Sequence, residues 1–105
     1  MKSKADRKVL DIVSKHAAPG SVHRVFHYLY FEDADAAAPV VAALRAEGFE
    51  VIDRTAGMEP KWLVLACHEI VPSETAMAKT RALMEHHAAG AGGEYDGWEV
   101  EILAN

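Results

Sequence analysis

The histidines are the first residues to test for chemistry, because imidazole is a common metal ligand and the chain contains six of them. His23 and His27 share one face of a predicted strand, yet lie about 13 Å apart at roughly 3.3 Å per residue. His86 and His87 are adjacent on a predicted helix and therefore point in different directions. The other two histidines have no partner at ligand spacing, and neither HExxH nor CxxC occurs. The sequence predicts surface or core-edge histidines, with no metal and no other cofactor.

A second candidate chemistry is acid–base catalysis by Glu94 and Asp96, which flank Tyr95. Two carboxylates and a phenol close together can transfer protons. No nucleophile or oxyanion-donor motif accompanies them, however. The simpler interpretation is structural: Asp96-Gly97 is a turn dipeptide, and Tyr95 and Trp98 anchor that turn on the core. We therefore expect no catalytic residue, and a protein that is not an enzyme.

The glycines just before this segment do not form a phosphate-binding loop. Gly90, Gly92 and Gly93 follow a predicted helix. Phosphate loops instead precede a helix, whose N-terminal N–H groups hold the anion. These glycines are better explained as the end of the helix.

An aromatic row, Phe26, Tyr28 and Tyr30, alternates along one face of the first predicted strand. Such a row could stack nucleic-acid bases, but Arg24 is the one cation beside it. Acidic residues on neighbouring predicted strands would repel phosphates if they share this face: Glu50, Glu99 and Glu101. The alternatives are rings that pack beneath the first helix or in a homodimer contact. Direct nucleic-acid binding is not expected.

Composition agrees with this conclusion. The 105 residues are 50% hydrophobic with a net charge of −5, enough apolar material for one core and too few cations for a general RNA binder. The lone Cys67 suits a reducing compartment. No signal peptide or transmembrane stretch is evident. We expect a single domain over residues 1–105, located in the cytoplasm and not bound to membrane.

Hydrophobic periodicity along the chain predicts the helices and strands that position these residues. A first helix runs from Ser3 to the Pro19-Gly20 pair, and strands follow at 22–31, 49–53, 61–71 and 98–102. Two further helices occupy about 33–47 and 73–89, with either Asp33 or Asp35 as the N-cap of the first, Ser73 as the N-cap of the second, and Gly48 as a C-cap. Pro39 is expected near the first turn of its helix, because proline is costly in a helix interior.

After the first helix, the order is strand, helix, strand, strand, helix, strand. The simplest closed arrangement is an α+β, ferredoxin-like βαββαβ sandwich: a four-stranded antiparallel sheet, two helices on one face, and the extra N-terminal helix. The first and third strands should be central, since residues 62–67 are nearly all apolar. The opposite face stays open to the first helix or to a partner.

The segment Glu94-Tyr95-Asp96-Gly97-Trp98 resembles the signature of the RraB family, protein inhibitors of ribonuclease E. Segments 48–51 and 27–29 resemble other parts of that family, and the likeness extends over about residues 4–103. The resemblance implies the same ferredoxin-like sandwich. It also implies a non-catalytic protein that binds ribonuclease E and modulates RNA turnover.

Two functional hypotheses follow. The first is a regulator of an RNA-degrading enzyme, with a protein partner that is expected to be ribonuclease E. The second is a self-associating ferredoxin-like module that takes a small ligand or another protein on its open sheet face. The candidate partner-binding residues are Glu94, Asp96, Glu99, Glu101, Tyr28 and Tyr30. The residues assigned to the structural signature are Tyr95, Gly97 and Trp98.

Overall fold

The computed structural model describes residues 22–56 and 61–101. Its elements, in chain order, are β1 (His23–Phe31), α2 (Ala34–Ala46), β2 (Glu50–Thr55), β3 (Trp62–Ile70), α3 (Glu74–Gly90) and β4 (Glu94–Val100). The first helix expected from the sequence lies outside the described residues.

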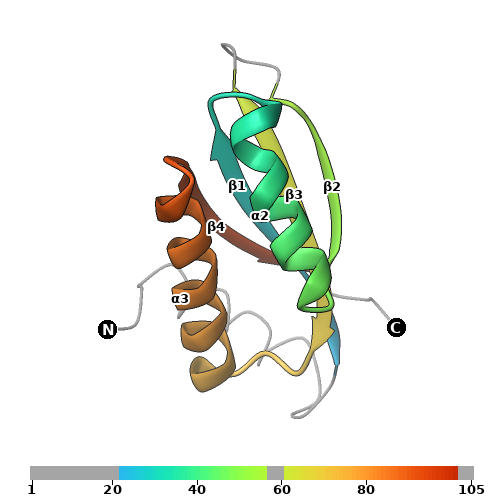
Figure 1. Cartoon of the computed structure of the whole chain (residues 1–105). Helices are drawn as coiled ribbons and strands as arrows, with labels where there is room; N and C mark the ends of the chain where they lie inside the picture. The colour runs from blue at the N-terminus through green and yellow to red at the C-terminus, as the bar shows by residue number, and fades with distance from the viewer. Residues whose placement is uncertain (1–21, 57–60, 102–105) are drawn as a thin grey trace.

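The described strands form one antiparallel sheet in the order β2-β3-β1-β4. The predicted α+β architecture, a four-stranded antiparallel sheet with two helices, is therefore confirmed for this part of the chain. The prediction that the first and third strands are central is also confirmed. Figure 1 shows both helices on the same side of the sheet, with α2 in front of β1 and β3 and α3 beside β4.

The alternation of β1 decides which side chains enter the core. Every second residue from His23 to Phe31 is buried on the helix side, and the residues between them are half-buried on the other face. The apolar stripe of α2 is buried against the sheet; it consists of Ala37, Val40, Val41 and Leu44. The core between the sheet and its two described helices thus lies on one face, and the even-numbered side chains of β1 lie on the other.

Both helices begin and end as predicted. The Asp33 carboxylate accepts from the Ala36 N–H at 2.8 Å, and the Ser73 hydroxyl accepts from the Ala76 N–H at 3.1 Å. At the end of α3, the Gly92 N–H donates to the Ala89 carbonyl and the Gly93 N–H to the Ala88 carbonyl. Gly92 has φ +70°, the left-handed conformation that this Schellman-type cap requires.

Two local predictions are wrong. Pro39 lies in the second turn of α2, not the first, because the Asp33 cap starts the helix at Ala34. β4 begins at Glu94 instead of Trp98, so Asp96-Gly97 is not a turn before the strand. The β1–β4 register shifts between Tyr28 and Leu29, which makes Asp96 the extra residue of a bulge inside the strand.

Candidate functional site

The face of the sheet opposite α2 and α3 brings together most of the predicted partner-binding residues. Tyr28 and Tyr30 project from β1 onto this face, each between buried helix-side neighbours. Glu94 on β4 is the cross-strand partner of Tyr30, and Glu99 is the partner of Phe26. Cross-strand partners lie on the same face about 4.5–5.5 Å apart. Two tyrosines and two carboxylates therefore share one half of the sheet.

Tyr28 and Glu99 are in direct contact. The Tyr28 hydroxyl donates to Glu99 Oε2 at 3.0 Å, an exposed hydrogen bond between β1 and β4. Desolvation, with this hydrogen bond and the charge of Glu99 as further causes, raises the pKa of Tyr28 above its ordinary value of 10.0. The phenol stays protonated at neutral pH and holds the carboxylate beside its ring.

The two remaining acidic candidates are exposed at the margin of this face. Asp96 is the exposed extra residue of the β4 bulge. Glu101 follows the end of β4, where its backbone N–H donates to the Arg24 carbonyl at 2.9 Å. Neither side chain contacts the tyrosines in the described contacts, so the structure does not gather all six candidates into one cluster.

Arg24, beside the aromatic row, contacts Phe26 and Glu50. Its guanidinium carbon lies 5.5 Å above the centre of the Phe26 ring. Its Nη2 atom lies 2.7 Å from Glu50 Oε2 on β2. Glu50 is thereby neutralised, whereas neither Glu94 nor Glu99 forms an ion pair in the described part of the chain. Among the described residues, two carboxylates without an ion pair, Glu94 and Glu99, therefore lie along β4.

The two aromatic signature residues lie on the opposite, helix-covered side, whereas Gly97 is the cross-strand partner of Tyr28. Trp98 is buried, 7% exposed, in a cluster with Val25 and Met77. Tyr95 is half-buried, with the guanidinium of Arg81 5.1 Å from its ring centre. These contacts agree with the anchoring role predicted for the two aromatic residues.

The sequence analysis missed a histidine network in the core. His27 is fully buried, not at the core edge as predicted. Its Nδ1 atom lies 2.9 Å from the Tyr95 hydroxyl, and its Nε2 atom lies 3.0 Å from Nε2 of His68 on β3. The Phe49 ring lies against His68, with centroids 4.6 Å apart. Only the pairing of β1 with β3 brings His27 and His68 together, and no local spacing signals it.

This network predicts a loss of stability in acid. Burial lowers the pKa of His68 below its ordinary value of 6.5, so the unfolded chain binds its proton more tightly. The contribution of His68 is therefore complete above about pH 6.5 and is lost as the pH falls towards the folded-state pKa. The Nε2–Nε2 hydrogen bond also cannot survive when both rings are protonated.

We expect the melting temperature of His68→Gln to fall less than that of the wild type between pH 7.5 and 5.5. Glutamine keeps a polar partner for His27 and does not titrate. The matched control is His86→Gln, on the exposed side of α3, which should keep the wild-type pH dependence. Equal pH slopes for all three proteins would contradict the assignment.

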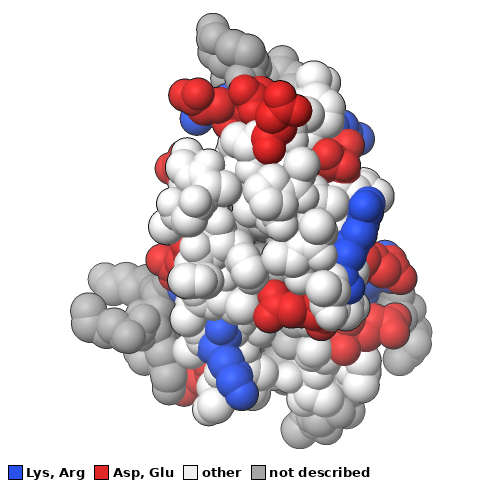
Figure 2. Space-filling view, in the orientation of Figure 1, with Lys and Arg blue, Asp and Glu red and all other residues white. Residues whose placement is uncertain are grey.

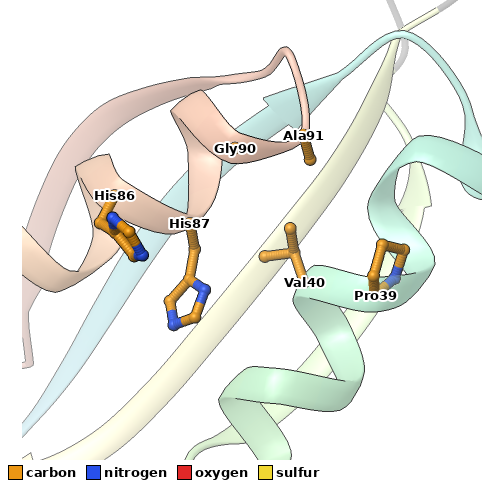
Figure 3. Close-up of a pocket in the computed structure, with 6 residues that line it drawn as sticks. All are labelled: Pro39, Val40, His86, His87, Gly90 and Ala91. Carbon is orange, nitrogen blue, oxygen red and sulfur yellow. The ribbon is translucent and has the colours of Figure 1, made fainter.

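A shallow hollow of about 180 Å³ lies between the two helices, lined by Pro39, Val40, His86, His87, Gly90 and Ala91. Figure 3 shows the His87 ring and the Val40 side chain pointing into the space between α3 and α2. His87 Nε2 lies 2.9 Å from Glu47 Oε2, which links the two helices. One of the residues that line the hollow, His87, therefore joins α3 to α2.

On its described part, the helix-covered face carries side chains of both charges (Figure 2). Across its described part, Lys and Arg side chains stand apart, and acidic side chains gather at the end where β1 passes into α2 (Figure 2). The exposed acidic residues of that connection are Glu32, Asp33 and Asp35. Within residues 22–56 and 61–101, no three potential ligands among His, Cys, Asp and Glu converge on a metal position. The described helices are too short or too polar to cross a bilayer.

Comparison with known proteins places the chain in a family. No curated protein matches it. The profile of the family described as regulator of ribonuclease activity B matches residues 3–100, nearly the whole chain. The signature segment Glu94–Trp98, whose Trp98 is buried and whose Asp96 forms the bulge, falls inside that match. The chain belongs to the RraB family of regulators of ribonuclease activity.

Proposed function

We propose that this protein is a non-catalytic regulator that binds ribonuclease E, or a related RNA-degrading enzyme, and inhibits or modulates its activity in RNA turnover. The observation that carries the proposal is the family match over residues 3–100. The net charge of −5 supports it, because an acidic protein is poorly suited to compete for RNA directly and well suited to a basic protein partner. Cytoplasmic location is part of the proposal, since RNA turnover takes place there.

The arrangement of the fold supports a binding function. We take the βαββαβ order, with β1 and β3 central, as ferredoxin-like. In such a sandwich the helices cover one face of the sheet, which leaves the other for recognition. We place the partner contact on that face, along β4 and the adjacent part of β1. Its candidate residues are Glu94, Asp96, Glu99, Glu101, Tyr28 and Tyr30.

Binding to purified ribonuclease E tests the proposal. Glu94→Gln and Asp96→Asn should each weaken binding about two- to fivefold, as expected for exposed charges, and leave the melting temperature nearly unchanged. Glu85→Gln is the matched control, since Glu85 is exposed on α3, on the other side of the sheet. Absence of wild-type binding would contradict the function. Binding unchanged by both variants would remove Glu94 and Asp96 from the contact.

Self-association through the same face is the competing candidate, and one observation favours it. Ile52, which projects from edge strand β2, is 57% exposed, an unusual exposure for a large apolar side chain. A monomer mass by light scattering at the concentrations used for the binding titration would remove this alternative. A dimer mass that disappears in Ile52→Glu would support it.

A further inference from the structure

The aromatic row on β1 is paired with carboxylates from the neighbouring strands, and one such pair already holds a guanidinium. Arg24 lies over the Phe26 ring at 5.5 Å and pairs with Glu50 at 2.7 Å. The flat cation thus has an aromatic surface below it and a carboxylate at its edge, the two groups that attract guanidinium most strongly. Within the protein itself, an aromatic ring next to a carboxylate therefore binds a guanidinium group.

The same combination recurs twice along β1 towards β4. Tyr28 is hydrogen-bonded to Glu99 at 3.0 Å, and Tyr30 is the cross-strand partner of Glu94. No cation from the described residues pairs with either carboxylate. The two tyrosines are two residues apart, about 6.6–7 Å along the strand.

Beside Tyr28 there is room for an added side chain. Its cross-strand partner is Gly97, which has φ +110° and presents no side chain. A Cβ atom built there would have nothing within 4 Å. The bulge therefore leaves open space at Gly97, the strand partner of Tyr28, in the stretch of β4 between Glu94 and Glu99.

We propose that Tyr28, Tyr30, Glu94 and Glu99 form a docking surface for an extended, arginine-rich segment of a protein partner. Alternate residues of an extended segment lie on one side and about 6.6–7 Å apart, which matches the spacing of the tyrosines. Arginines at such positions place one guanidinium on each ring, beside a carboxylate. RNA is the disfavoured occupant, because the two carboxylates would repel its phosphates.

Arginine should be preferred to lysine on this surface. A guanidinium is planar, stacks on an aromatic ring and can donate to both oxygens of a carboxylate, whereas an ammonium group is a compact point charge with a tightly held hydration shell. General attraction between a basic peptide and an acidic protein would show no such preference. The inference rests on the proposed function only for the identity of the partner, since the surface can be tested by itself.

The test uses two fluorescein-labelled peptides, in which threonine alternates with three arginines in one and with three lysines in the other. Each peptide is titrated with the full chain, and binding is measured by fluorescence anisotropy. The arginine peptide should bind about fivefold more tightly than the lysine peptide. Tyr28→Leu and Glu99→Gln should each weaken binding of the arginine peptide about fivefold. Glu85→Gln, which makes the same charge change on the other side of the sheet, should leave it unaltered. Circular dichroism confirms that each variant is folded.

Equal affinity for the two peptides, equal losses in Glu99→Gln and Glu85→Gln, or no binding of the arginine peptide would each overturn the proposal. Tighter binding of a labelled single-stranded RNA than of the arginine peptide would also overturn it. The outcome is separable from the proposed function. Peptide binding without ribonuclease binding would leave the surface standing and remove the function. Ribonuclease binding that neither Tyr28→Leu nor Glu99→Gln changes would support the function and remove this surface from the contact with the enzyme.

Discussion

Trp98→Ala should lower the free energy of unfolding by about 3–5 kcal/mol, a large share of the stability of a small domain. Trp98 is 7% exposed and packs with Val25 and Met77 where α3 crosses β1 and β4. Truncation to alanine leaves a cavity between the helix and the sheet that no neighbouring side chain is placed to fill. Urea denaturation followed by circular dichroism measures the loss.

The second tryptophan is the control for this experiment. Trp62, at the start of β3, is half-buried, and its indole N–H donates to Asp53 in an exposed hydrogen bond of 2.7 Å. Trp62→Ala should therefore cost clearly less than Trp98→Ala, since it removes less buried area. An equal or larger loss for Trp62→Ala would contradict the assignment of Trp98 as the anchor of the signature segment.

Gly93→Ala should destabilise the protein by about 3 kcal/mol, although it adds a single methyl group. The new Cβ atom would lie 2.6 Å from the Tyr30 carbonyl oxygen and would overlap the Phe31 ring. The Phe31 ring cannot move away, because Phe31 is only 2% exposed. The Gly93 backbone is also held in place, because its N–H donates to the Ala88 carbonyl at 2.7 Å. The methyl group forces the α3–β4 connection away from the end of β1.

Gly90→Ala is the matched control, three residues earlier. A Cβ atom at Gly90 would meet nothing within 4 Å, and alanine favours a helix over glycine by about 0.5–1 kcal/mol. Thermal melts should show Gly93→Ala well below the wild type and Gly90→Ala at or slightly above it. Similar melting temperatures for the two variants would mean that this connection does not pack closely against β1.

Much of the fold is predictable from local signals. The caps Asp33 and Ser73, the glycine at the end of each helix and the apolar character of β3 all act within a few residues, and each predicts its element correctly. A first-turn position for Pro39 would need Asp35 as the cap, whereas the structure uses Asp33, which starts the helix at Ala34 and puts Pro39 in the second turn. The start of β4 was missed because Asp96-Gly97 suits a bulge as well as a turn.

The site was predictable only in part. Alternation along β1 correctly puts Tyr28 and Tyr30 on one face, since that pattern is a property of a single strand. Which carboxylate stands beside which ring depends on the register between β1 and β4, and the bulge shifts that register. The contact of His27 with His68 likewise depends on strand pairing between residues 41 positions apart. Such long-range partners leave no local signal.

The face that carries the candidate site is separated from the parts that stabilise the fold. The side chains of Trp98 and Phe31 enter the core on the helix side, whereas Tyr28 and Glu99 face away from both helices. Conservative substitutions at Tyr28 and Glu99 should therefore change binding with little effect on stability. This separation lets binding and folding be tested with different variants.

The central claim, regulation of a ribonuclease by direct binding, is tested most directly by a cleavage assay with purified ribonuclease E and a labelled RNA substrate. Cleavage should fall as the protein is added and reach its limit near one protein per enzyme binding site, because the proposed target is the enzyme and not the RNA. The protein alone should neither cleave nor retard the RNA. A cleavage rate unaffected by a large molar excess of folded protein, or a reduction whose limit follows the amount of RNA instead of the amount of enzyme, would contradict the account.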